Sequence, residues 1–436
     1  MPHMFSDLPA FRRDLLGFLQ SRCASSTEPL ERLHLGPFPM YLVCDPTLVK
    51  PILKAPEEEL DKGRLIHKMR DVLGLSLLSI SGAEHRKRRA VIHGEISRGI
   101  TTTYVPVIAS IARKYAMRAV EQGSFDAHRL GAPLALRVIC DVLFGRGVLS
   151  SGDEAALINA VRLVEDDLAD KFFRVVPDLP WVAREKRRKL REARAIMHLV
   201  VGRARMRDRG ASILKTLADI GLEGEDLSNE ILTLILTGHH TTGSAAAWLF
   251  YYLATHPDIA EQIADEAAAI CDRSGEILPD SLARNAPVSR ALVNEVLRLY
   301  PSSHWFSRET KTRTEIGGRM LRRGTSLIIA PWAFGRDPRF WNNPDVFDIN
   351  RAHMANKAFV PFGAGPRACV GMGLAMTELQ IIALEFASAV EFVGAAPYPA
   401  PKPKASVALT PPSMSITVRP RRAVYSSARA PFLPAA

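Results

Sequence analysis

Cysteine and aromatic side chains are scarce in this chain, and both scarcities restrict what it can be. Five cysteines are spread over 436 residues without any CxxC pair, which argues against a zinc knuckle or a thioredoxin-like redox site. Aromatic residues make up 7%, and neither zinc-finger spacing nor an RNA-binding aromatic motif occurs. The formal charge of +11 favours an acidic partner, but these absences argue against nucleic acid.

Long uninterrupted hydrophobic runs are missing as well. None reaches the roughly 18 residues that cross a bilayer. The first twenty residues include Asp7, Arg12, Arg13 and Asp14, unlike a signal peptide or membrane anchor. Hydrophobic residues make up 47% and charged residues 24%, as in ordinary globular chains. We therefore expect a cytoplasmic protein with no membrane span, no internal repeats and no low-complexity linker.

Amphipathic patterns dominate the chain and predict a mainly α fold with a small β region. The β-like runs are short, at 39–44, 313–321 and 326–330, and each is bounded by glycine or proline. The segment 301–373 is rich in proline, glycine and arginine and is predicted to be ordered loop. Apolar residues recur every three or four positions in seven stretches, which predicts helices at 103–122, 153–172, 182–208, 227–255, 257–272, 286–300 and 371–389.

A glycine-rich loop around Cys369 carries the strongest chemical signal. Gly363, Gly365 and Gly371 bracket the cysteine, and glycine lets a backbone turn tightly and approach a flat ligand. The sulfur precedes a predicted helix start, where unpaired N–H groups and the charge of Arg367 favour a thiolate. Such a thiolate is an iron ligand or a nucleophile, and the loop contains no histidine base for a nucleophile.

The loop FGAGPRACVG resembles the haem-binding loop of soluble, bacterial-type cytochrome P450 proteins. It matches the pattern F-x-x-G-x-R-x-C-x-G at Phe362, Gly365, Arg367, Cys369 and Gly371. The resemblance implies that Cys369 is the axial ligand of a haem b iron, where a thiolate favours O–O cleavage. It extends from about 32 to 418 and implies a triangular helical fold. We expect an N-terminal segment at 1–31, one domain at 32–418 and a mobile tail at 419–436.

A second motif predicts a structural support for the cysteine loop. Glu295 and Arg298 stand at i and i+3 in NEVLRLYP, a spacing that usually marks a solvated surface pair. Here the flanking residues are apolar, so the helix is predicted to be buried, and it resembles the E-x-x-R helix of the family. Arg351 resembles the family's second arginine. A buried glutamate between two arginines is tolerable only when fully hydrogen-bonded.

The predicted helix 227–255 contains a candidate oxygen-activation site, TGHHTT. Gly238 costs about 1 kcal/mol relative to alanine in a helix, which indicates a close contact there. The stretch resembles the family motif A/G-G-x-D/E-T-T, which implies that Thr241 assists proton transfer to dioxygen; a plain threonine would only bond back to a carbonyl. His240 replaces the usual acid and could relay protons near neutral pH. His239 faces another direction, which argues against a two-histidine metal site.

Cationic side chains are predicted to bind the two haem propionates. His85 and Arg89 lie at i and i+4 and resemble the family's early propionate-binding helix, although a basic solvated helix would show the same spacing. By position, Arg308 and Arg367 resemble further partners. Three or four cations around two carboxylates are chemically sensible.

Electrons must come from another protein, because no GxGxxG motif follows a predicted strand and no flavin- or iron–sulfur-like segment occurs. We expect a ferredoxin or flavodoxin, with its NAD(P)H reductase, to dock on Arg86, Lys87 and Arg88. By the same resemblance, a second basic run at 184–191 lies where the family has its lid helices over the substrate. It is a solvated face, or it contacts an anionic substrate, a carrier protein or a lipid surface.

The resemblance implies a monomeric monooxygenase that splits O2 and oxidises an apolar small molecule, as in secondary metabolism. Apolar pockets do not reveal their ligand. A non-hydroxylating oxidation (desaturation, radical coupling or a peroxide-driven reaction) stays open because of His240, as does a non-catalytic haem-binding protein. Substrate contacts are expected at 73–78, 172–181, 236–240 with Leu236, 303–306 and 410–412, and the cluster His304, Trp305 and Phe306 is either a pocket wall or core.

Overall fold

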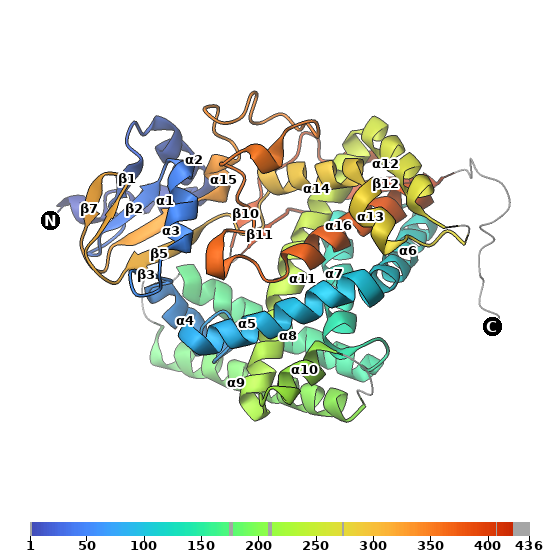
Figure 1. Cartoon of the computed structure of the whole chain (residues 1–436), viewed down its shortest axis with the longest axis horizontal. Helices are drawn as coiled ribbons and strands as arrows, with labels where there is room; N and C mark the ends of the chain where they lie inside the picture. The colour runs from blue at the N-terminus through green and yellow to red at the C-terminus, as the bar shows by residue number, and fades with distance from the viewer. Residues whose placement is uncertain (1, 174–177, 208–211, 273, 407, 422–436) are drawn as a thin grey trace.

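The structure is a computed structural model that describes residues 2–173, 178–207, 212–272, 274–406 and 408–421. A mixed sheet with three short helices lies at the N-terminal end, and a larger helical body makes up the rest (Figure 1). The expectation of a mainly α fold with a small β region is confirmed.

The helical body consists of long helices that bury apolar faces against one another. Hydrophobic periodicity predicted seven of these helices to within about three residues at each end. The long helices are α5 (Gly82–Gly99), α6 (Val105–Gln122), α7 (Ala127–Phe144), α8 (Ser151–Phe173), α9 (Pro180–Arg207), α11 (Gly224–Thr255), α12 (Pro257–Ile270), α14 (Pro287–Leu299) and α16 (Met372–Ala389). The shorter ones are α1 (Leu8–Arg13), α2 (Leu15–Ser25), α3 (Val49–Lys54), α4 (Arg64–Leu73), α10 (Ile213–Asp219), α13 (Pro279–Asn285) and α15 (Pro331–Phe334).

The strands form small sheets at the edges of the body. The largest has the order β1-β2-β8-β5-β3, with β2 and β8 parallel and the other neighbours antiparallel. A second has the order β4-β12-β9. The strands are β1 (Leu30–Leu33), β2 (Met40–Val43), β3 (Leu60–Asp61), β4 (Ser124–Asp126), β5 (Phe306–Thr310), β6 (Thr314–Ile316), β7 (Arg319–Leu321), β8 (Ser326–Ile329), β9 (Val390–Ala396), β10 (Lys404–Ala405), β11 (Leu409–Thr410) and β12 (Ser415–Pro420).

The hydrophobic core has two parts, one in the helical body and one beside the five-stranded sheet. The sheet part includes Leu19 and Cys23 of α2, so the expected N-terminal segment contributes to the core. The helical part includes α16. By length and composition α16 is apolar enough to cross a membrane, but 67% of that window is buried inside the fold, as in a core helix. Of the expected C-terminal tail, residues 422–436 lie outside the described part of the chain.

Helices α7 and α11 approach each other unusually closely. A Cβ added at Gly131 would lie 2.8 Å from the carbonyl oxygen of Gly243, and one added at Gly243 would lie 2.7 Å from Cα of Ala132. Helix α7 was not predicted, because it contains Pro133 and its apolar residues cover most sides, which obscures the helical period. The contact fixes α11, which carries the candidate oxygen-activation motif.

Gly243→Ala is expected to lower the free energy of unfolding by about 1–3 kcal/mol, because the new methyl group would press on the backbone of Ala132. Gly94→Ala in α5 is the matched control. A Cβ there meets no atom within 4 Å, so this variant should be more stable by about 0.5–1 kcal/mol. Urea unfolding followed by circular dichroism measures both. An unchanged urea midpoint for Gly243→Ala would show that α7 and α11 can move apart to admit the methyl group without loss of stability.

Candidate active site around Cys369 and helix α11

The cysteine loop folds back on itself and presents the sulfur just before α16. The backbone N–H of Cys369 donates to the carbonyl of Phe362 at 2.9 Å, and that of Ala368 donates to Gly365 at 3.0 Å. Gly365 has a φ of +71°, and a Cβ there would lie 2.5 Å from the carbonyl oxygen of Leu53. Glycine is therefore required at 365 both by conformation and by space.

The protonation of Cys369 differs from the sequence-based expectation. Its side chain is exposed by area, yet the protein surrounding the sulfur raises the pKa of the thiol above its ordinary value. The N–H of Gly371 and the charge of Arg89 act in the opposite direction but do not outweigh burial. The helix start and nearby cations alone thus do not produce a thiolate; a bound metal cation would supply the missing stabilisation.

Arg89 joins helix α5 to the cysteine loop. One of its guanidinium nitrogens donates to the carbonyl of Ala368 at 2.7 Å. His85, one turn earlier, is buried on the same side of α5. The predicted one-sided arrangement of His85 and Arg89 is therefore present, and it faces the protein interior rather than solvent.

A buried cationic cluster surrounds the same region. Burial, followed by repulsion from Arg367, lowers the pKa of His85 to about 4, of Lys62 to about 7 and of Arg308 to about 10. Arg367 itself donates to a carboxylate oxygen of Glu57 at 2.9 Å. The cluster concentrates more positive charge than its acidic neighbours offset, which fits a buried dianion such as the two propionates of haem. Sequence reasoning missed Lys62, because no motif or spacing marks it.

Glu295 is the centre of a buried hydrogen-bond network. Its carboxylate accepts from Arg298 at 2.6 and 2.7 Å, from Arg351 at 3.2 Å and from the backbone N–H of Asp348 at 2.9 Å. The His353 ring nitrogen lies 2.6 Å from its other oxygen. Burial alone would raise the pKa of Glu295, but these bonds and the charge of Arg298 hold the pKa at about 2. His353 was missed, since nothing in the sequence ties it to position 295.

Arg298 carries this network into the segment that precedes the cysteine loop. It donates to the carbonyl of Pro344 at 2.6 Å and to that of Val346 at 3.0 Å, and it also bonds the carbonyl of Gly335. A Cβ at Gly335 would lie 2.2 Å from the carbonyl oxygen of Arg298. The glycine thus lets this segment pack directly onto the end of α14.

The candidate motif lies at the centre of α11, where hydrogen bonds and a close contact with α7 hold it in place. The Thr241 hydroxyl donates to the carbonyl of Thr237 at 2.6 Å, and the Ser302 hydroxyl donates to the carbonyl of Thr241 at 2.7 Å. The close contact expected at Gly238 is with Ile139 of α7, whose Cγ1 would lie 2.9 Å from a Cβ at 238. A protein side chain, not a small ligand, therefore accounts for this glycine.

The two histidines of the motif are neutral at pH 7, so a proton relay through His240 would not involve titration of its ring near neutral pH. Burial is the main reason that the pKa of both His239 and His240 is lowered to about 4. Repulsion from His240 contributes at His239, and repulsion from His128 contributes at both. His239 Nε2 lies 3.6 Å from a carboxylate oxygen of Glu165 in α8. Within the described residues no group of three or more His, Cys, Asp or Glu side chains could hold a metal ion.

The residues expected to contact substrate are divided between buried positions and half-buried positions packed against the core. His304 is buried among core residues, and Leu236 is also buried. Trp305 and Phe306 are half-buried, and the Phe306 ring lies 3.9 Å from where a Cβ of Gly363 would be, next to the cysteine loop. Of the expected lid segment, residues 174–177 lie outside the described part of the chain.

The expected docking role of Arg88 is wrong. Arg88 lies three residues after His85, so it faces the same side of α5 and is buried. It donates to Glu84 at 2.7 Å and to Glu230 of α11 at 3.0 Å. Both oxygens of Glu230 also lie 3.0 Å from the backbone nitrogen of Leu77. The ion pair joins α5 to α11, and the bond from Leu77 fixes the loop after α4 to the same glutamate.

Glu295→Gln keeps the side-chain shape but leaves the buried Arg298 cation without its charged partner, so it is expected to destabilise the fold by about 3–5 kcal/mol. Glu192→Gln is the control, because Glu192 is exposed and lies 3.7 Å from the exposed Arg188; it should change stability little. Denaturant unfolding at pH 7 measures both.

The destabilisation caused by Glu295→Gln should also depend on pH. The folded pKa of Glu295, about 2, lies below the ordinary value of 4.5. Its carboxylate therefore stabilises the fold fully above about pH 4.5, and this contribution is lost as the pH falls through about 2. The difference in unfolding free energy between wild type and variant should narrow over that range. A difference that is independent of pH would contradict an ionised Glu295.

Comparison with known proteins agrees with this site. The family model "Cytochrome P450" matches residues 4–416. Cyclooctat-9-en-7-ol 5-monooxygenase of Streptomyces melanosporofaciens is 29% identical over 382 residues, covering 82% of this chain and 81% of the relative. Cyclooctatin synthase of the same organism is 26% identical, covering 81% and 80%. Human cytochrome P450 4V2 is 25% identical, covering 81% and 75%. The chain belongs to the cytochrome P450 family of haem-dependent monooxygenases.

Proposed function

We propose that this protein oxidises an apolar small molecule at a haem whose iron is ligated by Cys369. The observation that carries the proposal is the pairing of a cysteine sulfur, presented by a tightly folded loop, with the buried cationic cluster described above. Haem bound there supplies the redox chemistry that splits dioxygen and transfers one oxygen atom to the substrate. The non-catalytic alternative does not agree with membership of an enzyme family.

The residues around the haem would divide the work of holding it. His85, Arg308 and Arg367 would neutralise the propionates, with Lys62 as a further cation. Arg89 would do so through the nitrogens that do not bond Ala368. Phe362, Gly365 and Gly371 shape the cysteine loop, and Glu295, Arg298 and Arg351 hold the segment before it.

Proton delivery would depend on helix α11. The Thr241 hydroxyl donates to the helix backbone at rest and would turn to donate a proton during the reaction. Gly238 keeps the helix against α7 at this turn. His240 is neutral at pH 7, so it would pass a proton by accepting at one ring nitrogen while donating from the other.

We propose a substrate class from secondary metabolism, supported by the Streptomyces relative whose name gives cyclooctat-9-en-7-ol as its substrate. Half-buried Trp305 and Phe306 beside the cysteine loop, and Leu236 on α11, would contribute apolar contacts. The segments 73–78, 303–306 and 410–412 would complete the pocket.

Electrons would come from an acidic ferredoxin or flavodoxin and its NAD(P)H reductase. Arg86 and Lys87 are exposed on α5, the helix that contacts the cysteine loop through Arg89. Positive charge there would steer an acidic partner toward this face. We propose that the enzyme acts in the cytoplasm as a monomer.

A second candidate function is a non-hydroxylating oxidation such as desaturation or radical coupling. The observation that favours it is the neutral His240 where the family motif has an acid. Turnover with NADPH and a ferredoxin system, compared with turnover on hydrogen peroxide, distinguishes the candidates by their products and by their need for electrons.

Cys369→Ala is expected to abolish the carbon monoxide difference spectrum typical of a thiolate-ligated ferrous haem, because no other sulfur would reach the iron. Cys271→Ala, which alters a partly buried cysteine elsewhere, is the control and should keep the spectrum. An unchanged spectrum in the Cys369 variant would reject the ligand assignment.

His240→Asp and His240→Glu restore an acid to the motif and should change the fraction of electrons that leave as hydrogen peroxide, since proton delivery determines how oxygen is reduced. The measurement is peroxide formed per NADPH consumed, in the presence of a substrate that alters the iron spin state. Exposed His93, on α5, provides the control His93→Asp. The same ratio of peroxide formed to NADPH consumed in wild type and both His240 variants would exclude this residue from proton delivery.

A further inference from the structure

A second cavity lies between helices α9 and α11, away from the cysteine loop. Its volume is about 310 Å³, within the range of roughly 300–1,000 Å³ that small-molecule sites occupy. Its α11 wall ends at Leu232. Thr241 follows on the same helix, about 13 Å further along the axis at 1.5 Å per residue. The cavity therefore lies away from the turn of α11 that carries Thr241.

One side of this cavity is cationic. Arg191 and Arg194 of α9 line it, and neither forms an ion pair within the residues that the structure describes. Arg194 donates to the carbonyls of Asp71 and Val72 at 3.0 Å, at the end of α4, while its Nε is buried without an acceptor among the described residues. Glu225 also lines the cavity, but no ion pair joins it to either arginine. Two guanidinium charges thus face the cavity without a carboxylate partner.

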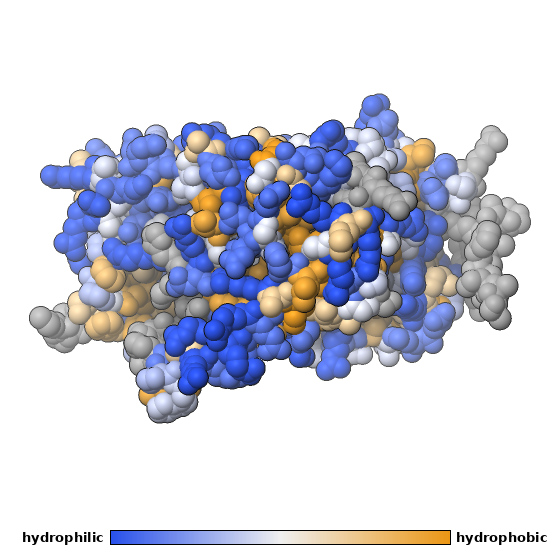
Figure 2. Space-filling model, turned by 90° about the horizontal axis from the view of Figure 1, so that it is seen from below, coloured by the Kyte–Doolittle hydropathy of each residue, from blue (hydrophilic) through white to orange (hydrophobic). Residues whose placement is uncertain are grey.

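Apolar side chains line another part of the cavity, beside the polar residues His198, Ser228 and Asn229. Met197 and Leu232 line it and are buried, and Ala195 lines it as an exposed residue with a short side chain. The molecular face on the α9 side is mostly hydrophilic, with small hydrophobic patches between polar side chains (Figure 2). A cationic edge beside an apolar floor matches a molecule that carries an anionic group on an apolar chain.

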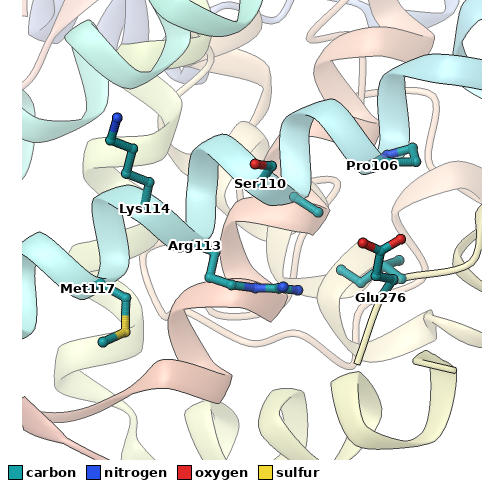
Figure 3. A pocket seen from close by; sticks show the side chains of 8 residues that line it. Pro106, Ser110, Arg113, Lys114, Met117 and Glu276 are labelled. Carbon is teal, nitrogen blue, oxygen red and sulfur yellow. The ribbon is translucent and has the colours of Figure 1, made fainter. Parts of the chain in front are cut away.

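Another groove of the molecule lacks this combination. It has a volume of about 280 Å³ and lies between α6 and the segment around Glu276, with Arg113 directed into it (Figure 3). There Arg113 donates to both carboxylate oxygens of Glu385 at 2.9 Å and to the carbonyl of Gly275 at 3.0 Å. Its charge is neutralised, and Glu276 adds negative charge. Lys114 also lines this groove, but the arginine there is already paired with a carboxylate.

We propose that the cavity between α9 and α11 is a second ligand site, which binds an amphipathic carboxylate through Arg191 and Arg194. The carboxylate accepts hydrogen bonds from the two guanidinium groups, and the apolar chain covers Met197 and Leu232. A bound molecule would touch α9 and α11 and lie beside the end of α4. This inference goes beyond the proposed function and does not depend on the substrate that is oxidised.

The test uses the full-length, haem-loaded protein with an iron-binding azole at saturation, so that the haem cavity is filled. Octanoate is titrated by isothermal calorimetry, with octanol as the uncharged probe of the same chain length. Octanoate should bind at least tenfold more tightly than octanol. Arg191→Gln and Arg194→Gln should each weaken octanoate binding roughly tenfold, because each removes a charge-assisted hydrogen bond. Arg187→Gln, exposed on the same helix but outside the cavity, should leave binding unchanged.

Ala195→Trp tests the location without removing a charge, because the indole would fill the cavity. It should abolish octanoate binding. Equal affinities for octanoate and octanol, or unchanged affinity in both Arg191→Gln and Arg194→Gln, would overturn the proposal, as would absence of binding in the azole-loaded wild type. The haem absorbance of each sample reports on the proposed function separately, so the two failures are distinguishable.

Discussion

The buried carboxylate of Glu295 is the contact on which the geometry of the cysteine loop depends. It collects hydrogen bonds from α14, from Arg351 and from His353, while Arg298 bonds backbone carbonyls at 335, 344 and 346. This segment has few helix or sheet partners, so its polar backbone groups need other ones. One buried charge therefore organises an irregular stretch of chain that precedes the loop carrying Cys369.

The cationic cluster differs from the Glu295 network, because its buried charges repel one another instead of being paired. Lys62, His85, Arg308 and Arg367 lie close enough that burial and mutual repulsion lower the pKa values of the first three. Keeping these groups together costs free energy, and a bound dianion would offset that cost. The same argument applies to Cys369, because burial raises the pKa of its thiol and a bound metal cation would stabilise the thiolate. The proposed haem would thus relieve both electrostatic costs at once, and its binding would stabilise the fold.

Local patterns explain how much of this could be predicted from the sequence. Helical periodicity located α6, α8, α9, α11, α12, α14 and α16, and the i, i+3 spacing identified Glu295 with Arg298. The misses involve pairs far apart in the chain: His353 is 58 positions from Glu295, and Arg88 is 142 positions from Glu230. No spacing rule joins such residues, because only the folded backbone brings them together. Lys62 was missed for the same reason. Helix α7 was missed because Pro133 and the apolar residues on most of its sides obscure the helical period.

Helix α11 connects these constraints, and its rigidity makes the histidine substitution informative. Gly238 and Gly243 hold it against α7, Ser302 bonds its carbonyl at Thr241, and Glu230 ties it to the loop after α4. A residue at 240 is thus fixed in place and cannot move to find a partner. Burial keeps its imidazole neutral at pH 7, so His240 stores no proton there, unlike a histidine that titrates near neutral pH. A proton relayed through it would therefore be accepted at one ring nitrogen while another proton is released from the other.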